Sequence, residues 1–152
     1  MKQFFLLATS MVFLFACNNS KRTSSGDATT KAPLTDTYWK LTELNGVAID
    51  ITPPNGKQIY LVMNSADKRA SGNAGCNGYG GNYELNSNGF NIKFGPMIHT
   101  QMACGVIETE VSYLKMLETV DSYYVNDTAL QLNRARMAPL AKFVKISGKP
   151  GN

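Results

Sequence analysis

The chain has 152 residues, of which 43% are hydrophobic and 17% charged, with a formal net charge of +4, three cysteines and one histidine. This length suits a single domain, and so low a charged fraction argues against a highly charged disordered chain. The first sixteen residues form the sole long apolar run, which excludes a membrane protein with several spanning helices. One histidine excludes any site that needs two, such as an HExxH zinc site.

The N-terminus has the pattern of an exported protein. Lys2 precedes an apolar run of about a dozen residues, which is short for a membrane-spanning helix and typical of a cleaved signal peptide. The run ends at Leu14-Phe15-Ala16-Cys17, which resembles a bacterial lipobox. In a lipobox the cysteine thiol is acylated with diacylglycerol and becomes the first residue of the mature protein. We therefore predict a signal peptide over 1–16 and lipidation of Cys17; the alternative is ordinary secretion with cleavage nearby and a stray cysteine.

A polar segment follows Cys17 and predicts a flexible tether over residues 17–35. It is rich in Ser and Thr, and Leu34 is its one large apolar residue. Such a coil has a root-mean-square reach of roughly 23 Å, which would hold a domain near a membrane surface. No acidic retention signal follows Cys17, so we expect the anchor in the outer membrane with the domain facing the periplasm. The domain itself is expected over 36–147, with a disordered tail at 148–152.

With Cys17 assigned to lipid, Cys76 and Cys104 remain as an even pair in a compartment that permits disulfides. A bridge between them would close a loop of about 29 residues, for which the chain-entropy treatment gives roughly 3.6 kcal/mol. We expect this disulfide. Two alternatives stay open: a free nucleophilic cysteine, and a metal site with His99 as third ligand, although the spacing matches no zinc pattern.

The glycine-rich segment 72–81 invites comparison with a nucleotide-binding loop. It lacks Gly-Lys-Ser/Thr, and it leads into a strand and a turn rather than into a helix. Glycines within a strand pattern mark bulges, tight corners or the close approach of another backbone. We interpret the segment as a corner of a small barrel and expect no cofactor and no metal. The basic residues are scattered along the chain, so nucleic acid is not an expected partner.

The remaining segments predict mostly strands. In the first, Trp39 and Leu41 alternate with polar residues and are expected to face inward, with Leu44 near them. Turns are expected at Asn45-Gly46 and at 53–56. Strands are expected at 38–44, 59–63, 69–73, 90–94, 122–125, 129–133 and 140–146. In the segment 90–94, three apolar residues are expected on one face: Phe90, Ile92 and Phe94.

After Cys104 the apolar period changes from two to that of a helix. Five residues recur at steps of four, three, three and three and predict one stripe that faces the core: Ile107, Val111, Leu114, Leu117 and Val120. Glu110 flanks this stripe, and its place near the helix N-terminus is attributed to the helix macrodipole. The predicted fold class is α+β, with a small antiparallel curled sheet or partial β-barrel and one principal packed helix.

Taken in order, these segments resemble the META domain family, also called HslJ-like, over residues 36–147. The residues that carry the resemblance are Trp39, Gly72, Gly75, Cys76, Asn77, Gly81, Tyr83, Thr100, Met102 and Cys104. The resemblance implies a small β-rich domain with one packed helix, often carried on bacterial envelope lipoproteins and associated with envelope stress tolerance. It implies no catalytic site, because the family has no generally accepted enzymatic chemistry.

The sequence therefore favours a non-catalytic envelope lipoprotein, attached to the membrane by lipid, that binds an unidentified envelope protein or a small ligand. A carrier of a small apolar ligand in a β-barrel is the first alternative, but the apolar residues are needed to fill the domain's own core. A Cys-dependent enzyme is the second. It would need Cys76 or Cys104 unbridged with His99 beside it, and no Gly-x-Ser-x-Gly motif is present.

Overall fold

The structure is a computed structural model that describes residues 33–51 and 56–150. The predicted signal peptide, Cys17 and most of the tether lie outside the described residues, as does all but Gly56 of the turn predicted at 53–56. The described strands, in chain order, are β1 (Tyr38–Leu44), β2 (Val47–Ala48), β3 (Tyr60–Met63), β4 (Arg69–Asn73), β5 (Gly78–Leu85), β6 (Ile92–Phe94), β7 (Ile98–His99), β8 (Ser122–Val125), β9 (Ala129–Asn133) and β10 (Ala141–Ile146). A helix, α1 (Ile107–Thr119), lies between β7 and β8.

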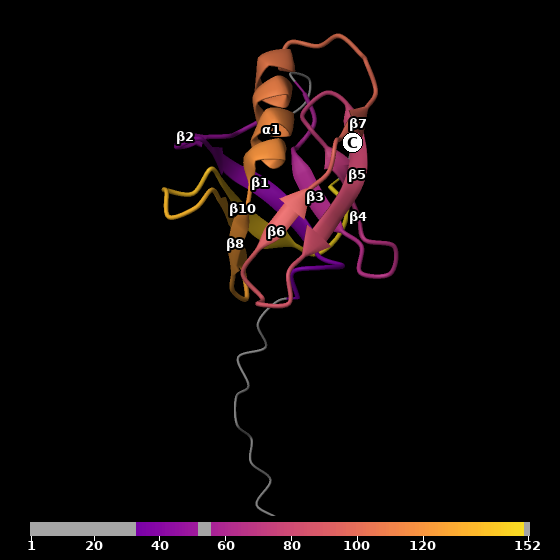
Figure 1. Ribbon diagram of the computed structural model, residues 1–152. Helices are drawn as coiled ribbons and strands as arrows, with labels where there is room; N and C mark the ends of the chain where they lie inside the picture. The colour runs from indigo at the N-terminus through magenta and orange to yellow at the C-terminus, as the bar shows by residue number, and fades with distance from the viewer. Residues whose placement is uncertain (1–32, 52–55, 151–152) are drawn as a thin grey trace, which may run out of the picture.

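The strands form one antiparallel sheet that curls until its two edges meet. Its order is β6-β5-β4-β3-β1-β10-β9-β8, with β2 added to β1 and β7 added to β5. At the seam, the Ile92 N–H donates to the Asp121 carbonyl (3.2 Å) and the Tyr123 N–H donates to the Phe90 carbonyl (3.0 Å). The sheet is thus nearly closed, with α1 packed over one side of it (Figure 1). The predicted α+β fold, a curled antiparallel sheet with one helix, is confirmed.

A bulge in β1 explains why the buried residues of this strand do not keep a spacing of two along its whole length. Trp39 and Leu41 are buried two residues apart, and the next buried residue is Leu44, three further on. The pairing of β1 with β10 shifts between Leu41 and Glu43, so one extra residue, Thr42, is inserted there. The period-two pattern therefore holds up to Leu41, and the bulge turns Leu44 back toward the core.

Large apolar side chains fill the interior of the curled sheet. The fully buried ones include Trp39, Leu41, Leu61, Met63, Tyr83, Leu130, Leu132 and Phe143. The Trp39 indole N–H also donates to the Leu34 carbonyl (3.0 Å), which fixes the chain just before β1. Since full burial of one such side chain contributes about 1.5–3 kcal/mol, this cluster is the main source of the domain's stability.

The predicted apolar stripe of α1 is wrong in its first half. Ile107 and Val111 are 42% and 59% exposed, whereas the buried face of the helix carries Glu110, Tyr113, Met116 and Leu117. The apolar spacing alone could not fix the rotation of the helix, because the carboxylate of Glu110 is drawn inward by hydrogen bonds to the backbone of the β4–β5 connection. Leu114 is only partly buried, while Leu117 and Val120 face the core as expected.

Phe90 was expected to share a buried face with Ile92 and Phe94, and this expectation is wrong. Phe90 is 70% exposed, and β6 begins only at Ile92. Its backbone N–H donates to the side chain of Asn88 (3.0 Å). Phe90 therefore belongs to an Asn-stabilised turn, where strand alternation does not apply.

The observed face of α1 gives a direct test. Leu117→Ala is expected to lower the free energy of unfolding by about 2–5 kcal/mol, because it empties a fully buried position. Val111→Ala, on the exposed face of the same helix, is the matched control and should cost less than about 0.5 kcal/mol. Urea unfolding of both variants measures the difference. Equal losses in the two variants would contradict the observed rotation of the helix.

Candidate functional site

Most of the residues that carry the family resemblance meet at one corner of the sheet. We call it the signature corner and define it as residues 72–78, from the end of β4 to the start of β5, together with residues 99–104, from the end of β7 toward α1. Gly72 is required here because a Cβ at that position would lie 1.9 Å from the Tyr60 carbonyl oxygen of β3. Gly75 has a φ of +111°, a conformation that favours glycine, and its N–H donates to the side chain of Asn73 (2.8 Å).

A disulfide between Cys76 and Cys104 joins the two halves of the signature corner. Their Cα atoms are 6.1 Å apart, within the usual range for a disulfide. The bond connects the glycine-rich corner to the segment that leads into α1. With both thiols joined, neither is available as a nucleophile or as a metal ligand.

Glu110 is the centre of the polar contacts in the corner, although it is only 1% exposed. One carboxylate oxygen accepts hydrogen bonds from the N–H groups of Asn77 (2.7 Å) and Cys76 (3.3 Å). The other oxygen accepts one from the Asn77 side-chain amide (2.8 Å). These three bonds compensate for the burial of the carboxylate. The macrodipole alone is therefore the wrong explanation for Glu110, which attaches α1 to the corner.

The Asn77 side chain extends this network to the segment before α1. Its oxygen accepts hydrogen bonds from the Thr100 hydroxyl (2.7 Å) and the Met102 N–H (2.8 Å). Its amide N–H₂ also donates to the Met102 carbonyl (3.1 Å). Asn77 thus forms hydrogen bonds with both the N–H and the carbonyl of Met102. The Met102 side chain is 54% exposed.

His99 lies at the rim of the network. Its Nδ1 atom is 2.9 Å from the Thr100 carbonyl oxygen and 3.8 Å from a carboxylate oxygen of Glu110. Because a carbonyl can only accept, Nδ1 carries the hydrogen in this geometry. His99 is thereby placed beside Glu110 rather than beside a free thiol.

A pair of buried tyrosines connects the helix to the sheet below the corner. The Tyr79 hydroxyl donates to the Tyr60 carbonyl (3.1 Å), so the Tyr113 hydroxyl, 2.7 Å from that of Tyr79, supplies the hydrogen of the second bond. Burial raises the pKa of Tyr79 and of Tyr113 above that of a free tyrosine, so both phenols stay protonated at neutral pH.

The other residues of the resemblance have packing roles away from the corner. Trp39 and Tyr83 are core residues, and the Tyr83 hydroxyl donates to the Asn64 carbonyl (2.9 Å). A Cβ on Gly81 would lie 2.7 Å from the Pro96 carbonyl oxygen, so this glycine permits close passage of the segment before β7.

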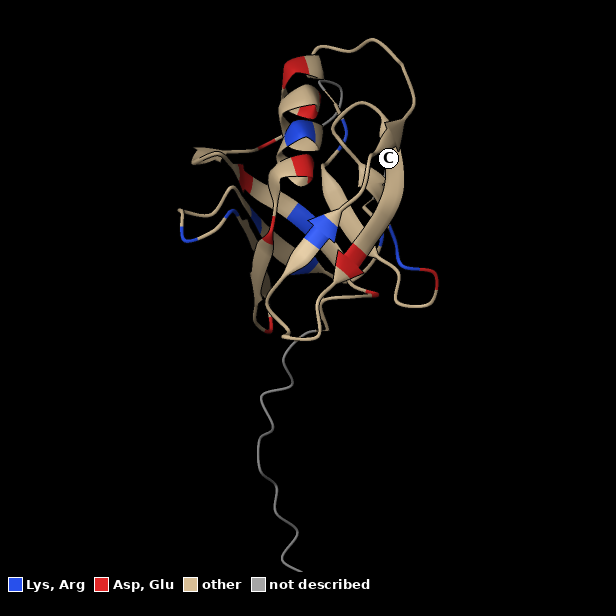
Figure 2. Ribbon diagram, viewed as in Figure 1, with Lys and Arg blue, Asp and Glu red and all other residues tan. Residues whose placement is uncertain are grey.

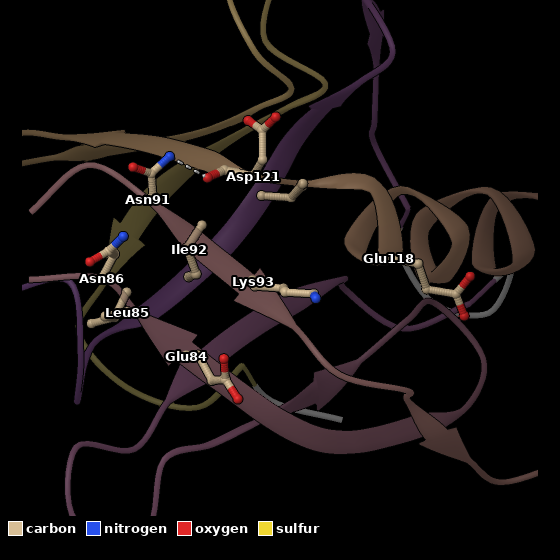
Figure 3. A pocket seen from close by; sticks show the side chains of 9 residues that line it. Glu84, Leu85, Asn86, Asn91, Ile92, Lys93, Glu118 and Asp121 are labelled. Atoms are coloured by element: carbon tan, nitrogen blue, oxygen red, sulfur yellow. Dashed lines mark hydrogen bonds between the residues drawn. The ribbon is translucent and has the colours of Figure 1, made fainter. Parts of the chain in front are cut away.

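A groove of about 550 Å³ runs along the seam of the sheet. It is lined by Glu84, Leu85, Asn86, Asn91, Ile92, Lys93, Glu118, Val120 and Asp121 (Figure 3). Its three carboxylates point to different sides, and that of Asp121 already accepts hydrogen bonds from the Ala135 N–H (2.7 and 2.9 Å). No common point is therefore surrounded by ligand-binding groups in this groove.

A smaller pocket of about 320 Å³ lies against the signature corner. It is lined by Lys57, Gln58, Tyr60, Gly72, Asn73, Cys76, Gly78, Met102, Lys149 and Pro150. Lys149 and Pro150 belong to the segment expected to be a disordered tail, of which residues 148–150 are described. This pocket combines two lysines with residues of the signature corner. None of the described residues that line the seam groove belongs to that corner.

Other charged residues of both signs are interspersed over α1 and the strands (Figure 2). Lys142 and Glu43 form an ion pair at 2.9 Å between β10 and β1. Within residues 33–51 and 56–150, no three His, Cys, Asp or Glu side chains come together in a way that could hold a metal ion. None of the helical structure in that same part of the chain has the length and apolarity to cross a membrane.

Sequence reasoning noted Glu110 near the start of the helix but missed its burial and its contacts with the corner, and it did not single out the two lysines of the pocket. The signal for Glu110 was available in part, since Tyr113 and Leu117 follow it at helical spacing, and the three share one face. Lys57 and Lys149 are separated by most of the domain, so no local pattern could place them together.

Comparison with known proteins agrees with these observations. The META domain family model matches residues 32–146. A solved NMR structure of a protein from Burkholderia xenovorans is similar, with 29% sequence identity and a TM-score of 0.59, over 76% of this chain and 85% of that one. Among curated proteins, none matches the chain. The predicted resemblance is confirmed, and the chain belongs to the META domain family.

Proposed function

We propose that the protein is a lipid-anchored lipoprotein of the bacterial cell envelope, held in the outer membrane with its META domain facing the periplasm. In this proposal the domain has a non-catalytic role, either binding an envelope protein or small ligand or supporting envelope stress tolerance. The observation that carries it is the distribution of the cysteines. Cys76 and Cys104 are joined, which leaves Cys17, at the end of a signal-like apolar run, as the third cysteine.

The state of the polar groups at the signature corner supports a non-catalytic role. A cysteine nucleophile would need a free thiol, and Cys76 and Cys104 form a disulfide. A carboxylate acting as general base must lie within reach of a substrate, and Glu110 is 1% exposed with its oxygens bonded to Cys76 and Asn77. META domains are not known as catalytic, in agreement with this arrangement.

The apolar-ligand carrier receives less support. Such a carrier needs an enclosed apolar cavity of several hundred Å³. In the described part of the chain, the interior of the curled sheet is occupied by large side chains such as Trp39, Leu61 and Phe143. Binding at the surface is therefore the more consistent form of the proposed role.

Cys17→Ser tests the anchor. Wild-type protein is expected in the membrane fraction with an acylated Cys17 at its N-terminus, because the thiol is the atom that receives the lipid. The variant is expected either in the soluble fraction or uncleaved. Fractionation and intact-mass spectrometry measure both properties, and Ser20→Ala, three residues downstream, is the matched control that should remain anchored. An unmodified N-terminus at another residue of the wild-type protein would contradict the proposal.

A further inference from the structure

The pocket at the signature corner carries positive charge without compensation from its own lining. Among the described residues that line it, Lys57 and Lys149 are the charged ones, and none is Asp or Glu. Among the described residues, the ion pairs are Lys142–Glu43 and His99–Glu110, so neither pocket lysine pairs with a described carboxylate. Two lysines that share a concave site attract an anion more strongly than the same lysines on a convex surface.

A neutral donor adds to this charge. The Asn73 side-chain oxygen accepts a hydrogen bond from the Gly75 N–H (2.8 Å), and its N–H₂ group can donate to a ligand. Lysine ammonium groups likewise only donate. The charged groups and the Asn73 amide in the lining therefore select an acceptor-rich ligand such as a phosphate or a carboxylate.

The wall of the pocket is held in place independently of any ligand. Cys76 is fixed by the disulfide, and the Met102 backbone is held by both ends of the Asn77 amide. A site formed in advance loses less entropy on binding. Its volume of about 320 Å³ is at the lower end for small-molecule sites, which suits a compact anion.

From this geometry we infer that the pocket formed by Lys57, Lys149 and Asn73 at the signature corner is a binding site for a small anion that carries a phosphate or carboxylate group. The inference rests on the proposed non-catalytic binding role and names its ligand class. Free solutes and the headgroup of an anionic lipid share this chemistry, and the experiment distinguishes them.

The experiment uses the full chain, isotope-labelled and purified in non-ionic detergent micelles. Inorganic phosphate and citrate are titrated in one arm, and phosphatidylglycerol is titrated into the micelles in the other. Saturable shifts of the Asn73 and Gly78 amide signals are expected. Lys57→Gln and Lys149→Gln should each weaken binding about tenfold, the effect of losing one charge-assisted hydrogen bond. Lys115→Gln, an equal charge change on the exposed side of α1, should weaken it less than about twofold.

Saturation by the dissolved anions assigns the site to a free solute, and saturation by phosphatidylglycerol alone assigns it to a lipid headgroup; both support an anion site. Absence of saturable shifts in both arms would overturn the inference, as would equal weakening by all three lysine variants. Neither result bears on the anchor, because anchoring is measured separately by fractionation of the Cys17→Ser variant.

Discussion

Glu110→Ala is expected to lower the free energy of unfolding by more than about 3 kcal/mol. The substitution removes three hydrogen bonds to a charged acceptor, each of which contributes about 1.5–3 kcal/mol, and leaves buried donors of Cys76 and Asn77 without partners. It also detaches the first turn of α1 from the signature corner. Chemical denaturation followed by circular dichroism measures the loss.

Two further variants separate the role of this carboxylate from general effects on the helix. Glu108→Ala removes an exposed carboxylate from the same helical turn and should change stability by less than about 0.5 kcal/mol. Glu110→Gln keeps the shape but places an amide N–H₂ against one of the donors, so an intermediate loss is expected. If Glu110→Ala is as mild as Glu108→Ala, the network does not stabilise the fold.

The strands and the general fold class could be predicted from the sequence because their signals are local. Alternation along 38–41 and the Asn45-Gly46 turn each depend on neighbouring residues, and the structure contains both. Where a distant contact decides the outcome, the local pattern was insufficient. Thr42 is bulged by its pairing with β10, and Phe90 is held in a turn by Asn88.

The rotation of α1 shows how a polar contact overrides an apolar pattern. Ile107 and Val111 continue the spacing of Leu114 and Leu117, so apolar spacing places all four together. With Glu110 turned outward, the N–H groups of Cys76 and Asn77 in the β4–β5 connection would lose this acceptor. The cost of unsatisfied buried donors explains why the carboxylate, and not Ile107, occupies the inner face.

The candidate site was predictable only in part, because part of it also depends on contacts between segments that are distant in the sequence. The family residues located the corner, since Cys76, Asn77 and Cys104 stand in recognisable local motifs. The pocket beside it depends on Lys57 and Lys149, which come from segments before β3 and after β10. These two segments are far apart in the sequence, and they come near each other because β3 and β10 both pair with β1 in the folded sheet.

The double variant Cys76→Ala/Cys104→Ala is expected to lower the free energy of unfolding by about 3–4 kcal/mol. The disulfide joins residues 28 apart in the chain, and opening a loop of that length restores conformational entropy to the unfolded state. The loss should appear mainly as a lower melting temperature, with the Glu110 hydrogen bonds still holding the corner in the folded protein. Calorimetry of the double variant made in the Cys17→Ser background, beside the Cys17→Ser protein itself, isolates the contribution of the disulfide.

Thiol labelling of the Cys17→Ser protein tests the same bond chemically. Native, oxidised protein is expected to take up no maleimide, whereas reduction should expose two thiols. Because Glu110 and the disulfide hold the same residues, combining Glu110→Ala with the double cysteine variant should give a loss that differs from the sum of the two by more than about 0.5 kcal/mol. Stoichiometric labelling of Cys76 or Cys104 in folded, oxidised protein would show that the bond is absent. A nucleophilic cysteine would then be possible. His99 is the single histidine of the chain, so it would be the imidazole that activates the thiol.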